Sequence, residues 1–309
     1  MKLAHGRLLD PKADLVFKKI FGCNKDLIKS FLNGLLPLAD DELIDTVEYL
    51  TPEQVPVTPL QKYSIVDVRC CDQKGRIFIV EMQMGWSPSF MSRLQFGTAK
   101  SYVSQLGKGF AYEQLNSVYG LSLVGEIFDP NTDEWYHHYK TVNMVDTRKQ
   151  IPGMEMIFVE LPKFKTTTHW EKKLGILWLR FLNEIADMKD IPQEFIDVPE
   201  ISKAIELTQE ASFSKEELAG YDGYWDRVSV EKTVKSDAER KGKAEGKAEG
   251  KAEGKAEGLA EGKAEGLAEG EAKRNREVVL KMLAKNFDDE TILECSGITA
   301  DELDALKKS

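Results

Sequence analysis

Hydrophobic residues recur every three or four positions in several stretches of the chain, which is the spacing of one face of a helix. Segment 10–22 (DPKADLVFKKIFG) has this spacing between Asp10, which can cap a helix, and Gly22, which can end one. Three further segments are predicted to be helical: 25–36, 89–108 and 169–188. In the last of these, an aromatic stripe that includes Trp170 and Trp178 is expected to lie in the core.

Between these helices lie segments rich in β-branched and aromatic residues, which favour strands. They are residues 45–50, 63–72, 76–84 and 116–128. A short loop that contains glycine separates the second segment from the third, and this pattern is typical of a β-hairpin. We expect a three-residue turn at Gln73, Lys74 and Gly75, with Gly75 in the left-handed conformation.

The predicted hairpin brings two carboxylates together. Asp72 pairs with Arg76 in this register, so Asp67 falls opposite Glu81, with about 4.5–5.5 Å between their Cβ atoms. Gln83 lies two residues beyond Glu81 and points to the same face. Half-buried carboxylates repel unless a proton or a cation lies between them, and such oxygen ligands suit Mg²⁺ or Mn²⁺. The spacing is equally compatible with carboxylates that face water on a one-sided sheet.

A low-complexity repeat occupies residues 242–272, where glycine recurs at every fourth position from Gly242 to Gly270. On a helix this spacing makes Lys a neighbour of Lys and Glu a neighbour of Glu, and each Gly costs about 1 kcal/mol relative to Ala. Ala, Glu and Lys nevertheless favour helix. The repeat is therefore predicted to be either a solvated, partly helical linker or a helix that packs with its copy from another chain.

The residues after the repeat, 273–309, are predicted to form two or three short helices. Thr299 and Glu302 make a capping box, and Gly297 lies in the preceding turn. Helix-turn-helix DNA readers share this outline, but here the last helix begins with the acidic residues Asp301 and Glu302. The favoured interpretation is a small packing or dimerisation module, so we expect a homo-oligomer formed through the repeat and this tail.

The composition indicates a protein with a sizeable core. The chain has 309 residues, of which 42% are hydrophobic and 30% charged, and no apolar run approaches the roughly 18 residues of a membrane span. The start has no secretory signal, and the four cysteines lack the spacing of a disulfide scaffold or a zinc knuckle, which favours a cytoplasmic location. The net charge of −10 argues weakly against nucleic acid, yet residues 1–100 carry 13 Lys and Arg against 12 Asp and Glu.

Four segments in a fixed order carry a family resemblance: DPKADLVFKKIFG, YSIVDVRCCD, IFIVEMQM and a helix with Arg93 and Tyr102. Over residues 8–185 they resemble the recombination-promoting nuclease family, whose members are also described as transposase-like nucleases. Asp67 followed by the triplet 81–83 (EMQ) is similar to the D…(D/E)-x-K core of the PD-(D/E)XK nuclease superfamily, with glutamine in the lysine position.

This resemblance implies an α/β fold of the restriction-endonuclease-like type, with a mixed central sheet flanked by helices. The nuclease core would occupy residues 1–165 and a helical extension residues 166–240. The repeat would occupy residues 241–272, and the small helical module residues 273–309. The implied function is a metal-dependent DNA endonuclease that hydrolyses phosphodiester bonds, in bacterial DNA recombination or in defence against mobile DNA.

The resemblance also assigns roles to individual residues. Asp67, Glu81 and the main-chain carbonyl of Met82 would bind Mg²⁺, with Mn²⁺ or Ca²⁺ as substitutes. Asp67, Glu81 and Gln83 would form the catalytic set. A lysine in place of Gln83 would orient the attacking water and add positive charge, whereas glutamine can only orient it.

Cations near this set are candidates for contact with DNA phosphates, with ordinary surface charge as the alternative: Lys18, Arg93 and Lys100. Asp14, four residues before Lys18, would be either a supplementary metal ligand or the ion-pair partner of Lys18. The rival function is that of a non-catalytic, self-assembling interaction protein on the same fold. Gln83 and the acidic net charge favour the rival, whereas the opposed carboxylates favour the enzyme. The expected partners are DNA and further copies of the chain.

Overall fold

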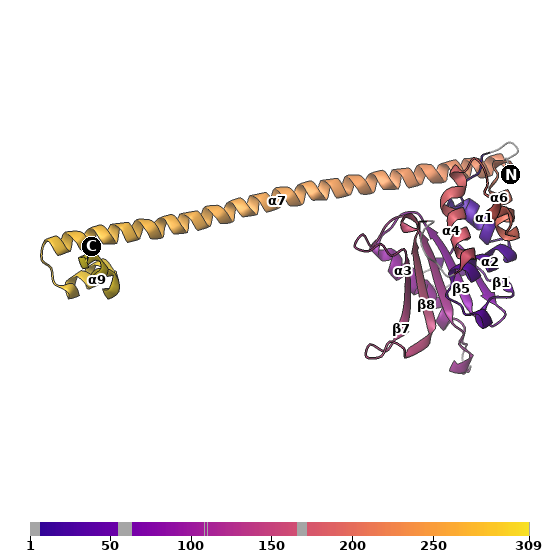
Figure 1. Ribbon diagram of the computed structural model, residues 1–309, viewed down its shortest axis with the longest axis horizontal. Helices are drawn as coiled ribbons and strands as arrows, with labels where there is room; N and C mark the ends of the chain where they lie inside the picture. Colours follow the sequence, from indigo (N-terminus) through magenta and orange to yellow (C-terminus); the bar gives the residue numbers. More distant parts are fainter. Residues whose placement is uncertain (1–6, 55–63, 108, 110, 166–171, 309) are drawn as a thin grey trace. The chain divides into compact units, whose positions relative to one another are not determined.

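A mixed six-stranded sheet lies at the centre of the first of two compact units, residues 1–233 (Figure 1). The computed structural model describes residues 7–54, 64–107, 109, 111–165 and 172–308. In sheet order the strands are β1 (Val47–Tyr49), β4 (Val68–Asp72), β5 (Ile77–Gln83), β6 (Val118–Val124), β8 (Gln150–Glu160) and β7 (Tyr136–Val142). Strands β5, β6 and β8 run parallel, and the other three are antiparallel to their neighbours. This is the mixed sheet that was expected.

Helices cover both faces of the sheet because the central strands are hydrophobic on both sides. In β5, Phe78 and Val80 belong to the larger core, whereas Ile77 and Ile79 belong to a smaller core on the opposite face. The larger core contains residues of α1 (Asp14–Phe21), α2 (Lys25–Leu35), α4 (Lys173–Glu184), α5 (Gln193–Ile196) and α6 (Pro199–Thr208). The smaller core lies under α3 (Pro88–Val103). Strands β2 (Glu53–Gln54) and β3 (Ser64–Ile65) form a separate two-stranded ribbon.

Most of the predicted elements are confirmed, but the start of the first helix is wrong. Helix α1 ends at Gly22 as predicted, yet it begins at Asp14. Asp10 does not cap it, because its carboxylate accepts the Lys12 N–H and its carbonyl accepts the Ala13 N–H, so the chain makes a turn before the helix. Trp170 of the predicted fourth helix lies outside the described residues. Strands β7 and β8 were not predicted.

The β4–β5 hairpin has the predicted turn and register. Gly75 has φ of 77°, and the Asp72 N–H donates to the Arg76 carbonyl at 3.1 Å. Val68 pairs with Val80, as this turn requires. A Cβ atom on Gly75 would lie 2.7 Å from the side chain of Asn116, so that both the backbone conformation and the available space require glycine.

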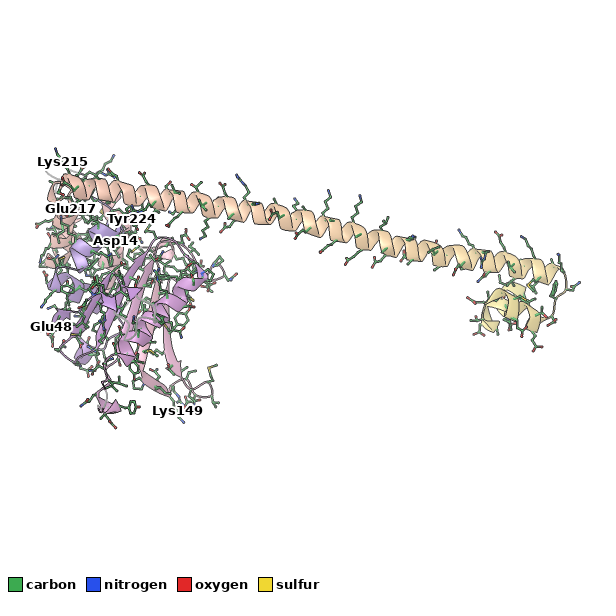
Figure 2. The ribbon with its side chains drawn as sticks, turned by 180° about the vertical axis from the view of Figure 1, so that it is seen from behind. Asp14, Glu48, Lys149, Lys215, Glu217 and Tyr224 are labelled. Carbon is green, nitrogen blue, oxygen red and sulfur yellow. The ribbon has the colours of Figure 1, made fainter. Side chains whose placement is uncertain are left out.

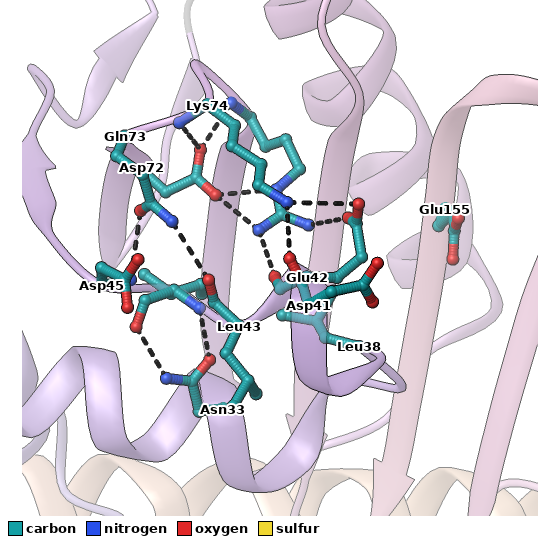
Figure 3. Close-up of polar contacts among 12 residues, drawn as sticks. Asn33, Leu38, Asp41, Glu42, Leu43, Asp45, Asp72, Gln73, Lys74 and Glu155 are labelled. Carbon is teal, nitrogen blue, oxygen red and sulfur yellow. Dashed lines mark hydrogen bonds and ion pairs between the residues drawn. The ribbon is translucent and has the colours of Figure 1, made fainter.

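A buried ion pair holds the turn in place (Figure 3). The Asp72 carboxylate accepts the main-chain N–H groups of Lys74 and Arg76, and it also accepts from Arg76 Nε at 2.7 Å. The Arg76 guanidinium reaches Glu42 at 2.6 Å, and the side chains of Gln73 and Lys74 bond to the main chain near Glu42. Loss of one partner from such a buried pair costs about 3–5 kcal/mol. The network therefore fixes the hairpin register.

The second unit, residues 234–309, contains most of α7 and two short helices. Helix α7 runs without a break over Lys215–Ala284, so the repeat is helical, and every residue from 241 to 272 is exposed. Helices α8 (Asp289–Ser296) and α9 (Ala300–Lys308) follow. Thr299 and Glu302 form the predicted capping box, with the Thr299 N–H donating to the Glu302 carboxylate at 2.8 Å.

The C-terminal module has a small core of its own, made of Val279, Ile292 and Leu303. The exposed apolar side chains near it are Val278, Leu280 and Phe287. None of the helices in the described part of the chain is long and apolar enough to cross a membrane.

Candidate active site

A cavity of about 1010 Å³ lies at the carboxyl end of β5 and is lined by side chains from α1, β5, α3 and α7. Figure 2 shows Asp14 of α1 and Tyr224 of α7 at this end of the first unit, and Lys149 at the other end. Open α/β sheets commonly bind ligands beyond the carboxyl ends of their parallel strands. We call this space the Asp67–Glu81 cavity, after its two most buried carboxylates.

Asp67 enters the cavity from a bend between β3 and β4, not from within a strand. If the β4–β5 ladder continued past Val68, the Met82 N–H would donate to the main-chain carbonyl of Val66, and the Val66 N–H would donate to the carbonyl of Met82. The Val66 N–H instead donates to Pro52, which turns the chain away, and the Asp67 carboxylate accepts the Met82 N–H at 2.8 Å. The register thus runs as predicted up to Val68, and the bond to β5 then comes from the Asp67 side chain.

Glu81 lies on β5, on the face of the sheet that packs against α3, and its side chain is only 11% exposed. Burial raises the pKa of Glu81 to about 7, and the negative charge of Asp67 adds to the rise. Burial also raises the pKa of Asp67, whose side chain is 17% exposed, although the Met82 N–H and Lys18 oppose the rise. Two carboxylates with raised pKa values thus share one partly closed space.

Arg93 of α3 lies between Glu81 and Gln83. Its Nη2 donates to Gln83 Oε1 at 2.8 Å and lies 3.6 Å from Glu81 Oε2. The side chain is 52% exposed and packs over the Phe90 ring. The guanidinium therefore provides positive charge beside the side-chain amide of Gln83.

Lys18 of α1 joins Asp67 to Asp14. Its Nζ lies 2.7 Å from Asp14 and 3.5 Å from Asp67. Burial alone would lower the pKa of Lys18, but the hydrogen bond to Asp14 and the charges of Asp67 and Asp14 raise it above the ordinary value. Asp14 thus forms the ion pair with Lys18 that their spacing predicted, and it lines the same cavity as Asp67 and Glu81.

The model of the PD-(D/E)XK nuclease family transposases matches residues 11–234. The chain belongs to this family. Neither the curated proteins nor the solved structures with which the chain was compared contain a match. The matched span includes every residue that lines the cavity, from Asp14 to Glu231, and the restriction-endonuclease-like fold agrees with the mixed sheet and its flanking helices.

The Asp67–Glu81 cavity is lined by most of the residues that the sequence singled out. They are Asp14, Lys18, Asp67, Glu81, Met82, Gln83 and Arg93. Lys100 is different: it lies in the last turn of α3, with Nζ 5.8 Å from the centre of the Phe96 ring, and it does not line the cavity.

Sequence reasoning missed the contribution of α7, which lines the cavity with Tyr224, Arg227 and Glu231. Burial raises the pKa of Tyr224, as do the nearby charges of Asp14 and Asp67. Arg227 is exposed and forms no ion pair with a described residue. The available signal was the aromatic cluster of YDGYWDRV with its single arginine, but no spacing rule linked it to the hairpin.

The donor set fits a hard divalent cation. Within the described ranges there is no group of three or more His, Cys, Asp or Glu residues that could hold a metal. Mg²⁺ does not need one, since it often uses one or two carboxylates and keeps several waters. Asp67 and Glu81 supply buried oxygens whose repulsion a cation would relieve, and Met82 also lines the cavity. Nucleases of this superfamily typically use divalent metals.

Proposed function

We propose that the chain hydrolyses phosphodiester bonds of DNA as a metal-dependent endonuclease. The observation that carries this proposal is the pair of buried carboxylates, Asp67 and Glu81, which share one cavity with exposed cations from three helices. Repulsion between the carboxylates favours the binding of a divalent metal ion between them. The surrounding lysine and arginine side chains favour the binding of a phosphate group. Family membership supports a nuclease-like chemistry.

In this proposal Asp67, Glu81 and the main-chain carbonyl of Met82 hold Mg²⁺, with Mn²⁺ or Ca²⁺ as substitutes. The hydrogen bond from the Met82 N–H keeps the Asp67 carboxylate oriented. When bound, a divalent cation polarises the scissile phosphate and lowers the pKa of a water. Gln83 orients the attacking water through its side-chain amide, and Arg93 supplies the charge that glutamine lacks.

The scissile phosphate would be held by Lys18 and Arg93, and Arg227 would add a contact from α7. These residues come from three helices around the cavity, and lysine and arginine are the side chains with which proteins bind phosphates. Lys100 would contact a phosphate further along the strand, because it lies beyond the cavity on the same helix as Arg93. The biological setting that the family suggests is DNA recombination or defence against mobile DNA.

The decisive assay is nicking of supercoiled plasmid by the full-length chain with Mg²⁺, Mn²⁺, Ca²⁺ or EDTA. We expect Asp67→Ala and Glu81→Ala each to lower the rate by more than the roughly 10- to 100-fold typical of groups that only support a metal ligand. Glu48→Ala is the matched control, because Glu48 is an exposed strand carboxylate outside the cavity. Undiminished cleavage by either cavity variant would contradict the proposal.

Cation binding can be measured without activity by following the melting temperature at pH 8. A cation present at about 100 times its Kd stabilises the folded chain by about 2.7 kcal/mol. Wild type should gain this stability with Mg²⁺ or Mn²⁺, and Glu81→Ala should not. A wild-type chain that neither binds the cation nor cuts DNA, but still self-associates, would favour the rival function of an interaction protein.

A further inference from the structure

Two exposed apolar side chains share the Asp67–Glu81 cavity with the carboxylates. Phe96 of α3 is 43% exposed, and Ile65 of β3 is 60% exposed. The partner strand of β3, β2, contacts α3, which brings the ribbon that carries Ile65 near the helix that carries Phe96. The cavity thus offers an aromatic face and an aliphatic side chain beside a site suited to phosphate.

Basic residues flank Phe96 along α3. Arg93 and Lys100 are three residues before it and four residues after it, so all three side chains lie on one side of the helix. Arg93 lies beside Glu81, and Lys100 Nζ lies 5.8 Å from the centre of the Phe96 ring. Across the cavity, α7 supplies the exposed Arg227.

An exposed aromatic ring between cations is the combination by which proteins hold unpaired nucleotides, since the ring stacks on a base while the cations face phosphates. A base inside a duplex has its faces covered by its neighbours and reaches such a ring only after unstacking. We propose that the cavity takes an unpaired nucleotide, with its base on the Phe96 ring beside Ile65 and its phosphate toward Arg93. The identity of the polymer as DNA rests on the proposed function.

The test uses a single-stranded oligonucleotide with one 2-aminopurine and a fully paired duplex of the same sequence. The full-length chain binds each probe in EDTA, so that no strand is cut, and 2-aminopurine fluorescence falls when the base stacks. Wild type should quench the single strand and should bind it more tightly than the duplex, in which 2-aminopurine is already stacked on its neighbours. Phe96→Ala should lose the quench and bind the single strand roughly 5- to 150-fold more weakly, the effect of losing one stacked base.

Three variants sharpen this test. Phe96→Trp should keep the quench, whereas Phe96→Leu should lose most of it, because leucine keeps apolar volume but has no aromatic face. Tyr112→Ala is the control, because Tyr112 is an aromatic residue that is 83% exposed and lies outside the cavity. If Phe96→Ala binds and quenches the single strand like wild type, or if wild type binds the duplex as tightly as the single strand, the inference is wrong. Plasmid nicking by Phe96→Ala, measured separately, shows whether the proposed nuclease function survives that result.

Discussion

The charge of Glu81 should destabilise the folded protein at neutral and alkaline pH. Its side chain is 11% exposed and shares the cavity with the carboxylate of Asp67, and the ion pair with Arg93 at 3.6 Å only partly offsets this cost. The substitution Glu81→Gln keeps the size of the side chain and removes the charge. We therefore expect a more stable protein, although the same change removes a proposed metal ligand.

The size of the effect follows from the pKa. Below an ordinary glutamate pKa of 4.5, Glu81 is protonated in both the folded and the unfolded chain, and its charge costs nothing. As the pH rises to about 7, the unfolded chain releases its proton first, so the folded state loses stability. Above that pH the loss is about 3 kcal/mol. For a unit of 233 residues this corresponds to roughly 6–12 °C in the melting temperature.

The assay is thermal unfolding of wild type and Glu81→Gln in EDTA between pH 5 and pH 8.5. The variant should melt well above wild type at pH 8.5, and the difference should shrink toward pH 5. Glu48→Gln, which changes an exposed carboxylate on β1 (Figure 2), should show no such pH-dependent gain. If the difference in melting temperature between Glu81→Gln and wild type stays constant across this pH range, the reasoning is refuted, because the buried charge of Glu81 would then not cause the difference.

Two further predictions concern the glutamine and the tail. The double variant Gln83→Lys with Arg93→Gln should cut plasmid faster than Arg93→Gln alone, because the new lysine returns the lost charge to the same place; equal rates would contradict a charge role for Arg93. A chain that ends at residue 240 lacks the repeat and the tail, so light scattering should show a smaller assembly. It keeps every residue that lines the cavity, so DNA binding should keep its salt dependence. A collapse of its DNA affinity would show that the tail holds DNA.

The hairpin could be predicted from the sequence because its determinants are local. The glycine turn, the strand-forming residues and the pairing of Asp72 with Arg76 lie within a few positions of one another. They were sufficient to bring Asp67 and Glu81 together. The bend at Asp67 could not be predicted in this way, since it depends on the bond from Val66 to Pro52 and on the ribbon of β2 and β3.

The contribution of α7 could not be predicted because it depends on contacts between distant parts of the chain. The Asp10 N–H donates to the hydroxyl of Tyr221, and the Tyr224 hydroxyl donates to the Lys12 carbonyl, so the start of α7 is held against the turn before α1. No local pattern encodes these contacts. The missed strand β7 is different: it lies at the edge of the sheet and is polar, with His137, His138 and Lys140 among its residues, so it lacks the hydrophobic pattern of the central strands.

The residues that line the cavity all belong to the first unit, so the proposed cleavage and the proposed self-association through the tail can be tested separately. The last of them on α7, Glu231, precedes the boundary at residues 233 and 234, and the repeat begins later. The tail has its own small core around Ile292. Residues 234–309 also carry 15 Lys and Arg against 18 Asp and Glu, a balance that does not favour phosphate binding. Self-association through the repeat would therefore change how many cavities act together, while the chemistry of each would depend on Asp67, Glu81 and their surrounding cations.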